Sequence, residues 1–285
     1  MPKLSDAKPR DLPGLHNVVA YHDNFLSGSA PEGDAGFDSL SALGVKTVIS
    51  VDGAAPEVDR AAARHLRYIH LPIGYNGFDD TRRLELARAV RDAAREGPVY
   101  IHCHHGKHRS AGAAGAVAVV LGWLTPDAAT ARMRVSGTGE NYTGLYRCVA
   151  VARPIEARAL DAVDADFPAV NQPQGWVKTM VEIDAVFDRL KAIESAGWTT
   201  PKNHPDLVPV AEAGRLADLF RLLDTPASSK ARPTACLELL RGAQRDAQAL
   251  ENLLAASPTA GEAELGKRFR VVAESCKACH GRFRD

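Results

Sequence analysis

The chain of 285 residues has no excess of charge, because 35 Lys and Arg residues balance 35 Asp and Glu residues. Without net charge there is no global attraction to nucleic acid or to an anionic membrane, so any binding of anions has to be local. The longest apolar run, around 112–124, is rich in glycine and too short to cross a bilayer. We therefore expect neither a nucleic-acid partner nor a membrane span.

Cysteine is scarce, and the five cysteines do not make a disulfide framework in a chain of this length. The first thirty residues also lack the apolar segment of a signal peptide. This absence predicts a cytoplasmic protein or the trimmed mature form of an exported one. Hydrophobic residues, at 45%, are numerous enough for a proper core and for two ordinary domains.

The first part of the chain, up to about Pro154, alternates strand-like and helix-like segments. Runs of β-branched and aromatic residues at 46–52, 67–72 and 98–103 predict strands. Between them, 79–97 has apolar residues at helical spacing and ends on a glycine. This alternation predicts an α/β domain over 1–160, with a mostly parallel central sheet flanked by helices.

The strand signals stop after Pro154. A linker that contains prolines is expected at 161–175, followed by helical segments at 176–196, 207–223, 234–256 and 261–283. Each segment carries an apolar stripe, and the links between them are short. The second part therefore predicts an all-α, up-down-up-down four-helix bundle over 176–285.

The stretch "YIHCHHGKHRSAG" follows a predicted strand and opens a predicted helix. Cys103 would end the strand, at the edge where α/β sheets place their sites. The next backbone amides, from His104 to His108, can form a nest that binds a phosphate at the positive end of the helix. Gly106 tolerates the backbone angles that this turn needs. The position favours the thiolate form of Cys103.

The residues that open the helix complete the predicted phosphate site. Arg109 can clamp two oxygens of the bound group with its planar fork, and Ser110 can donate a hydrogen bond to the thiolate when it leaves. The loop also has an unusually basic rim, formed by His104, His105, Lys107 and His108.

A zinc site is the alternative for the same loop, because four histidines surround Cys103. A tight phosphate nest aims its amides inward and most of its side chains outward, so these imidazoles do not readily converge on one ion. His102, which precedes the turn, is expected to be a buried orienting residue. We therefore favour phosphate over metal.

The segment "HCHHGKHRS" matches the signature H-C-x5-R-[ST] and resembles the cysteine-dependent protein tyrosine and dual-specificity phosphatases, with the resemblance covering roughly Leu15–Pro154. The resemblance implies hydrolysis of phosphomonoesters on a protein or a small molecule, without a cofactor. In that reaction Cys103 attacks phosphorus and forms a cysteinyl-phosphate, while Arg109 stabilises the transferring group. The alternative is a weak or inactive module that only senses phosphate.

Members of that family usually carry a general acid, an aspartate on a mobile loop that precedes the cysteine. Here the corresponding segment reads "LPIGYNGFDDTRR", which makes Asp79 the first candidate. Asp80 also falls there, although it reads as the N-cap of the next helix. Asp52 ends a predicted strand on the same edge, where a role in a turn is the other interpretation. The identity of the acid stays open among these three.

The C-terminal segment "CKACH" has the C-x-x-C-H pattern of c-type haem attachment, with Cys276, Cys279 and His280. Both cysteines continue the apolar stripe of the last helix at spacings of four and three. A thioredoxin-like pair or half of a zinc site are alternatives, but the first lacks a βαβ context and the second lacks another pair of ligands. Cys148 and Cys236 read as buried small apolar residues.

A C-x-x-C-H motif on the last helix of a bundle resembles the class II cytochromes, the cytochrome c-prime group, over about 176–285. The resemblance implies a covalent haem with His280 as the axial ligand and a role in electron transfer, gas sensing or redox sensing, with a redox partner. Met180 is either a second ligand or a core methionine. Because haem is attached outside the cytoplasm, the motif predicts a periplasmic or otherwise exported bacterial protein. Cytoplasmic production would leave Cys276 and Cys279 without haem.

Overall fold

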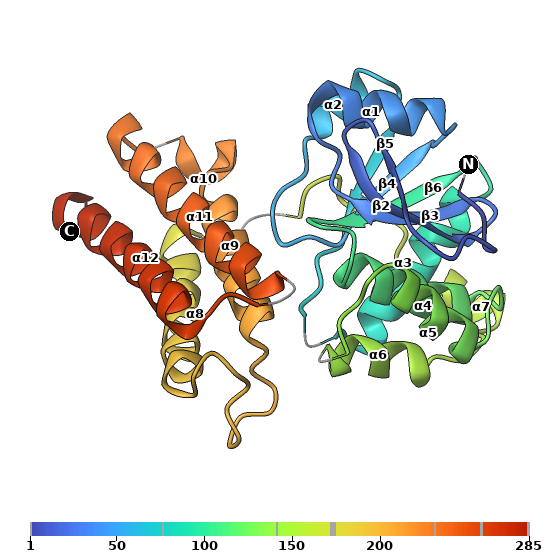
Figure 1. Cartoon of the computed structure of the whole chain (residues 1–285). Coiled ribbons are helices and arrows are strands. Elements are labelled where there is room, and N and C mark those ends of the chain that lie inside the picture. The colour runs from blue at the N-terminus through green and yellow to red at the C-terminus, as the bar shows by residue number, and fades with distance from the viewer. Residues whose placement is uncertain are drawn as a thin grey trace. The chain divides into compact units, whose positions relative to one another are not determined.

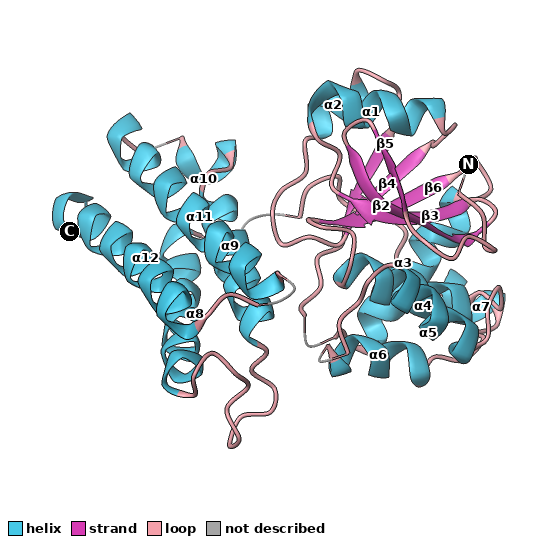
Figure 2. Cartoon of the chain, viewed as in Figure 1, coloured by secondary structure: helices cyan, strands magenta, loops and turns pink. Residues whose placement is uncertain are grey.

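The computed structural model describes residues 2–75, 77–140, 142–171, 175–230, 232–256 and 259–283. The chain divides into two compact units. The first unit comprises Met1–Asp52 and Pro56–Asn171, and the second comprises Gly53–Ala55 and Gln172–Asp285. Figure 1 follows the chain through the elements of each unit, and Figure 2 separates its helices from its strands.

The first unit is built on a mixed sheet of six strands in the order β1-β2-β3-β6-β4-β5. The four strands β3, β6, β4 and β5 are parallel to one another, whereas β1 and β2 join them antiparallel at one edge. The strand bounds are β1 (Arg10–Leu12), β2 (Leu15–His22), β3 (Phe25–Ser29), β4 (Thr47–Ser50), β5 (Arg67–His70) and β6 (Val99–Cys103).

The helices of this unit cover the two faces of the sheet, with α1 and α2 on one side and α3 to α7 on the other (Figure 2). Their bounds are α1 (Gly33–Ala42), α2 (Val58–Ala62), α3 (Asp80–Ala93), α4 (Arg109–Val120), α5 (Pro126–Val135), α6 (Thr143–Ala150) and α7 (Ala157–Asp161). Because both faces are covered, the central strands are buried along their whole length, which explains their nearly continuous apolar sequence.

The α/β sheet with flanking helices is therefore as predicted, and all three predicted strands are present as β4, β5 and β6. The antiparallel edge was not predicted. It makes the sheet mixed, with its four parallel strands placed next to one another.

Helix α4 is the central helix of the first unit, and every one of its residues is buried. Small residues make this possible. A Cβ on Gly112 would lie 3.1 Å from the Cβ of Leu145, and one on Gly115 would lie 3.0 Å from a methyl group of Val149. Helix α6 thus packs close against α4. This packing fixes the N-terminal end of α4, which follows the basic loop.

The second unit is helical in the residues that the structure describes. Its elements are α8 (Trp176–Ser195), α9 (Pro209–Leu223), α10 (Pro226–Ser229), α11 (Thr234–Ala255) and α12 (Glu262–Phe283). The four long helices begin and end within two residues of the predicted segments, and their buried faces share one apolar cluster. Phe269 of α12 is one of its buried members, and its ring centroid lies 4.7 Å from that of Phe187 and 5.6 Å from that of Trp198. Over the described residues, no helix has the length and apolarity to cross a membrane.

Candidate active site

The strand β6 and the helix α4 carry the predicted nucleophile and the predicted phosphate-binding arginine. Cys103 is the last residue of β6, in register with Ser29 of β3, and Arg109 is the first residue of α4. Both side chains are buried, with exposed fractions of 3% and 2%. The thiol and the guanidinium therefore lie at the carboxyl edge of the parallel strands and at the positive end of α4, as predicted.

Glycine is required at the centre of the loop between them. Gly106 has a φ of +72°, and a Cβ at this position would lie 2.3 Å from the backbone of Gly28 and Ser29. Any other residue would meet both the strain of the left-handed region and a clash with β3. The loop is thus seated directly against the strand that neighbours β6.

The carbonyl groups of the loop are held from outside it. His104 O accepts a hydrogen bond from Ala30 N at 3.1 Å, and Lys107 O accepts one from Thr138 Oγ1 at 2.6 Å. In a trans peptide unit the N–H points away from the C=O. The amides of the next residues therefore point to the opposite side of the loop, which is the arrangement that an anion nest needs.

Asn17 is a site residue that the sequence analysis missed. Its buried side chain donates from Nδ2 to Gly106 O and to Ser136 O, both at 2.8 Å. The backbone of Asn17 has a φ of +59°, which Asn tolerates better than most residues. Asn17 therefore ties the loop to β2 and to the end of α5. The left-handed backbone gives no signal in a sequence.

Ser110 contacts the sulfur of Cys103. The two heteroatoms, Cys103 Sγ and Ser110 Oγ, are 3.4 Å apart, with the thiol as donor. The Ser110 hydroxyl in turn donates to Gly28 O at 3.5 Å. This hydroxyl can rotate to donate to the sulfur when the sulfur is ionised, as the prediction requires.

The guanidinium of Arg109 is held by two side chains from other elements. Its Nη2 donates to the Tyr75 hydroxyl at 3.0 Å and lies 3.7 Å from Asp52 Oδ1. The guanidinium carbon also lies 4.2 Å from the centroid of the Tyr75 ring. Of the three candidate acids, Asp52 lies beside Arg109, and its side chain is buried.

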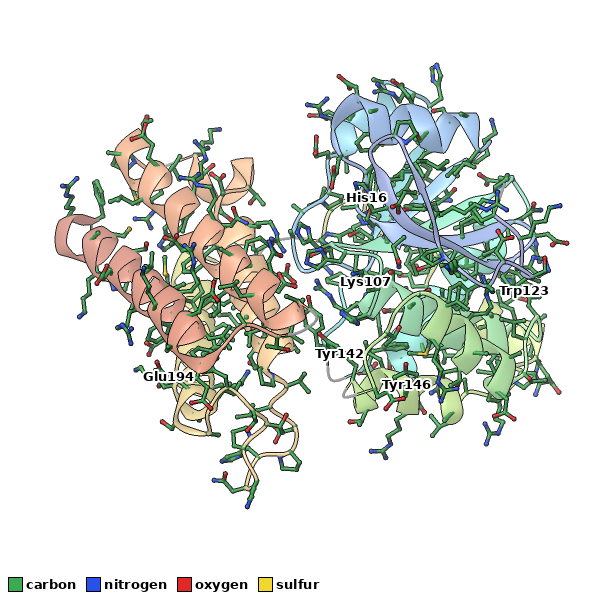
Figure 3. All side chains as sticks on the ribbon, viewed as in Figure 1. His16, Lys107, Trp123, Tyr142, Tyr146 and Glu194 are labelled. Carbon is green, nitrogen blue, oxygen red and sulfur yellow. The ribbon has the colours of Figure 1, made fainter. Side chains whose placement is uncertain are left out.

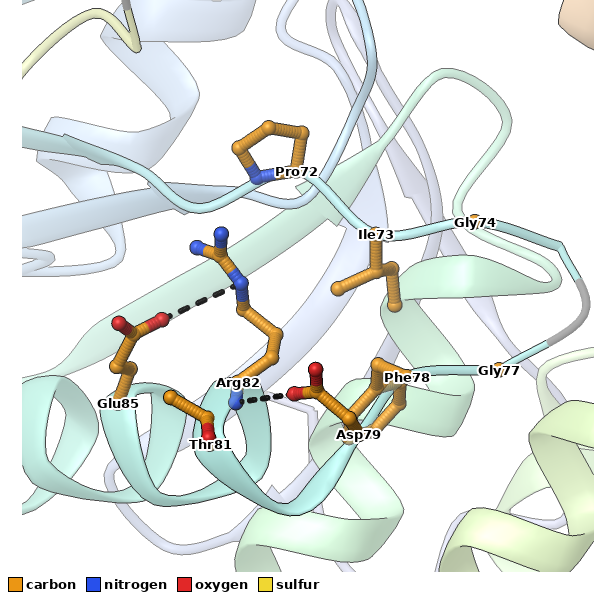
Figure 4. Close-up of a pocket in the computed structure, with 9 residues that line it drawn as sticks. All are labelled: Pro72, Ile73, Gly74, Gly77, Phe78, Asp79, Thr81, Arg82 and Glu85. Atoms are coloured by element: carbon orange, nitrogen blue, oxygen red, sulfur yellow. Dashed lines mark hydrogen bonds and ion pairs between the residues drawn. The ribbon is translucent and has the colours of Figure 1, made fainter.

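Asp79 caps a helix in this structure. Its Oδ1 accepts a hydrogen bond of 2.8 Å from the backbone N–H of Arg82, as Figure 4 shows. The prediction that Asp80 is the N-cap was wrong by one residue, because Asp80 is the first residue of α3 and pairs with Arg83 at 2.8 Å. Asp79 also lines a cavity of about 300 Å³, together with Pro72, Ile73, Gly74, Gly77, Phe78, Thr81, Arg82 and Glu85.

Two buried histidines support the carboxyl edge of the sheet. His102 Nε2 lies 2.5 Å from the Tyr68 hydroxyl, and burial lowers the pKa of His102 to about 4. His102 is therefore buried, as predicted, and its lowered pKa keeps it neutral near pH 7. His70 donates from Nε2 to Asp52 O at 2.9 Å and accepts from Asn171 N at Nδ1, and burial lowers its pKa as well. His70 was not predicted, although it positions the backbone of Asp52.

The other histidines of the loop do not gather around a metal. His104 and His105 lie against each other with ring centroids 4.4 Å apart, while His108 stacks on Tyr142 at 4.0 Å. Figure 3 labels Tyr142 and the exposed Lys107. In the part of the chain that the structure describes, no three His, Cys, Asp or Glu side chains form a group that could hold a metal ion.

The second candidate site lies along α12 of the second unit. Cys279 is buried, Cys276 packs against the apolar cluster, His280 is exposed, and Met180 of α8 packs against the same cluster. None of the cysteines is in a disulfide. Burial and the neighbouring sulfur of Cys236 raise the pKa of Cys279 to about 11. Cys236 is buried, as is Cys148, whose sulfur accepts from Phe78 N at 3.3 Å.

The donor set on α12 suits a covalently attached haem in its chemistry. Two thiols three residues apart lie on the inner side of one helix, and an imidazole follows them directly. The motif is helical throughout.

The chain matches no protein-family model. Its curated relatives are dual-specificity protein phosphatases. Two of them, both TpbA from Pseudomonas aeruginosa strains, are 34% identical over 103 residues, which is 35% of this chain and 46% of theirs. The chain thus spans about half the length of the curated relatives it matches.

Solved structures of the same class overlap with about half of the chain. The crystal structure of P. aeruginosa TpbA has a TM-score of 0.46 and 24% identity, and covers 55% of this chain and 96% of its own. TpbA in complex with pTyr gives a TM-score of 0.42 and 25% identity over 57% of this chain and 98% of its own. The structure of human DUSP28 has a TM-score of 0.39 and 20% identity, and covers 54% of this chain and 99% of its own.

Proposed function

We propose that the first unit hydrolyses phosphomonoesters through a cysteinyl-phosphate on Cys103. The observation that carries this proposal is the placement of three side chains around one loop. The thiol of Cys103 ends β6, the guanidinium of Arg109 begins α4, and the Ser110 hydroxyl lies 3.4 Å from the sulfur. The similarity to dual-specificity phosphatases supports the same reaction class.

The proposed reaction has two displacement steps. The phosphate monoester binds with its oxygens on the amides of the loop and on Arg109, and the Cys103 thiolate attacks phosphorus. The P–S bond forms while the P–O bond to the leaving group breaks, and the leaving oxygen takes a proton. Water then attacks the cysteinyl-phosphate and releases inorganic phosphate, while Ser110 donates a hydrogen bond to the departing thiolate. No cofactor is needed.

We propose that the general acid, if the reaction uses one, is one of the three predicted aspartates, Asp79, Asp80 or Asp52. Asp79 accepts a hydrogen bond from Arg82 N as the N-cap of α3. Asp52 lies 3.7 Å from Arg109 Nη2. Because both carboxylates are engaged with other groups in this structure, we expect the enzyme to be fastest on esters whose leaving group needs no protonation. A comparison of aryl phosphates that differ in the pKa of their phenol tests this expectation.

The substrate class we propose is a phosphorylated protein or small molecule, and the relative TpbA has been seen in complex with pTyr. Hydrolysis of p-nitrophenyl phosphate by the full chain, abolished in Cys103→Ser, is the direct test. Wild-type protein that binds inorganic phosphate but turns over no ester would contradict the enzyme and leave the alternative, a phosphate-binding module. Binding is measured by titration calorimetry.

We also propose that the second unit is a four-helix bundle in which Cys276 and Cys279 would hold a c-type haem and His280 would bind its iron. Met180 is proposed as the second ligand, because it packs against the same apolar cluster as Cys276. When bound, the haem would supply a redox-active iron.

This second proposal includes export to the periplasm and a redox partner, because haem is attached outside the cytoplasm. Protein that is produced together with haem-attachment machinery should show a Soret band that resists extraction by acid and acetone. The Cys276→Ser, Cys279→Ser double variant is the matched control and should lose that band. A colourless wild-type product would contradict the proposal without affecting the phosphatase.

A further inference from the structure

Arg109 reaches the loop with its guanidinium already held in place. The side chain is 2% exposed, and both of its contacts with other side chains described above engage Nη2. Tyr75 makes the larger contact, since the guanidinium carbon lies over its ring, 4.2 Å from the centroid, while its hydroxyl accepts from Nη2 at 3.0 Å. Tyr75 itself belongs to the segment between β5 and α3, far from α4 along the chain.

A row of rings extends this contact back to the loop. The centroid of the Tyr75 ring is 5.8 Å from that of Tyr142, and Tyr142 stacks on His108 at 4.0 Å with an interplanar angle of 19°. His108 is the N-cap residue of α4 and precedes Arg109 directly. Tyr75 is thus supported on one side by Tyr142, which in turn stacks on the residue that precedes Arg109. This closed arrangement resists movement of the Tyr75 ring away from the guanidinium.

We infer that Tyr75 is a positioning residue for Arg109, an inference that rests on the proposed phosphatase function of the same site. A bidentate clamp on phosphate needs the guanidinium fork in one orientation. Arginine has several rotatable bonds, and ordering them at the moment of binding would weaken affinity. The stack on Tyr75 orders the fork before the phosphate arrives, and the order then persists into the transition state.

The test uses two variants of Tyr75 that separate its ring from its hydroxyl. Tyr75→Leu removes the stack and the hydrogen bond, so we expect affinity for inorganic phosphate and kcat/KM for p-nitrophenyl phosphate each to fall about tenfold. Tyr75→Phe keeps the stack, so both should fall only about two- to threefold. Phosphate affinity is measured by calorimetry in the full chain, both as the single variants and in the Cys103→Ser background, where no turnover interferes.

Trp123→Leu is the matched control for loss of an aromatic ring in the same unit. Trp123 stacks on His22 at 4.3 Å, beyond the C-terminal end of α4 (Figure 3). This variant should lower the temperature of unfolding while phosphate affinity and kcat/KM stay at the wild-type level. A comparison with it separates positioning from a general loss of stability.

Two results would overturn the inference. One is wild-type phosphate affinity in Tyr75→Leu. The other is an equal loss in Tyr75→Phe and Tyr75→Leu that grows with the pKa of the leaving phenol, because the hydroxyl would then be a proton donor rather than a support. A wild type that binds phosphate without hydrolysing esters contradicts the proposed enzyme, yet the phosphate affinities of the variants still decide the role of Tyr75.

Discussion

The β6–α4 loop and the C-terminal end of α12 both carry short motifs with cysteine and histidine, but the two are built in different ways. The loop depends on contacts from far along the chain. Asn17 reaches Gly106 across 89 positions, and Tyr75 reaches Arg109 across 34. The motif on α12 lies within one regular helix, where the spacing of residues alone decides which side chains share a face.

This difference shows where a sequence motif alone is sufficient to place its side chains. On α12, residues three apart turn to the same side, so Cys276 and Cys279 reach the interior without help from distant residues. The β6–α4 loop has no regular secondary structure, so the spacing of its residues does not decide where their side chains point. Its shape comes from Gly106 against β3 and from carbonyl groups that are bonded to other elements. Changes far from the loop in sequence should therefore damage it.

The largest effect, on kcat, is expected from a substitution of Arg109, which directly follows the loop. Arg109→Lys keeps the positive charge but loses the planar fork, so kcat for p-nitrophenyl phosphate should fall about 10²–10³-fold. Lys267→Arg on α12 is the control, since it exchanges the same two residue types on an exposed position. Retention of more than a third of wild-type kcat in Arg109→Lys would show that the clamp is not needed.

The next effect is the loss of stability at low pH that the buried His102 causes. It concerns the carboxyl edge of the sheet and not α12. The pKa of His102 is about 4 in the folded chain, below its ordinary value of 6.5, so the unfolded chain binds a proton first as the pH falls. Stability is thus fully present above pH 6.5 and is lost between pH 6.5 and 4, by about 3 kcal/mol. His70 contributes in the same direction.

The measurement is urea unfolding of the full chain at several pH values between 4 and 7, followed by the fluorescence of Trp123 in a chain whose other two tryptophans, Trp176 and Trp198 of the second unit, are replaced by Phe. In His102→Gln the residue cannot take up a proton when the chain unfolds, so the slope of unfolding free energy against pH should become flatter than in the wild type. An unchanged slope would mean that folding does not lower the pKa of His102.

Asn17 allows the long-range character of the loop to be tested directly. Asn17→Ala leaves Gly106 O and Ser136 O without this donor and places alanine at a φ of +59°, so the free energy of unfolding should fall by about 2–3 kcal/mol. Asn17→Gly relieves the backbone strain but not the lost hydrogen bonds. It should recover about 1 kcal/mol of stability without recovering kcat/KM.

If both Asn17 variants unfold at the wild-type urea concentration and keep wild-type kcat/KM, the loop holds its shape without β2. The site of the first unit would then be as local as the motif on α12, and the comparison above would be wrong.

The same contrast explains how much could be predicted from the sequence. Cys103, Arg109 and Ser110 lie within eight residues between a clear strand and a clear helix, so their placement followed from the local pattern. Strands β2 and β3 were missed because "LHNVVAYH" does not alternate cleanly and "FLSGS" is rich in small residues. Asn17, His70 and Tyr75 were missed because each acts across a tertiary contact that no local pattern encodes.

The smallest effect concerns the chemistry of α12 and leaves the fold intact. Because the pKa of Cys279 is about 11, alkylation by iodoacetamide between pH 7 and 9 should be slow and should rise about tenfold per pH unit. Cys236→Ala removes the neighbouring sulfur that helps to raise this pKa, so Cys279 should be alkylated faster at each pH. Mass spectrometry of the peptide with Cys276 and Cys279 measures both rates. Equal rates in wild type and Cys236→Ala would show that the two helices do not bring these sulfurs together.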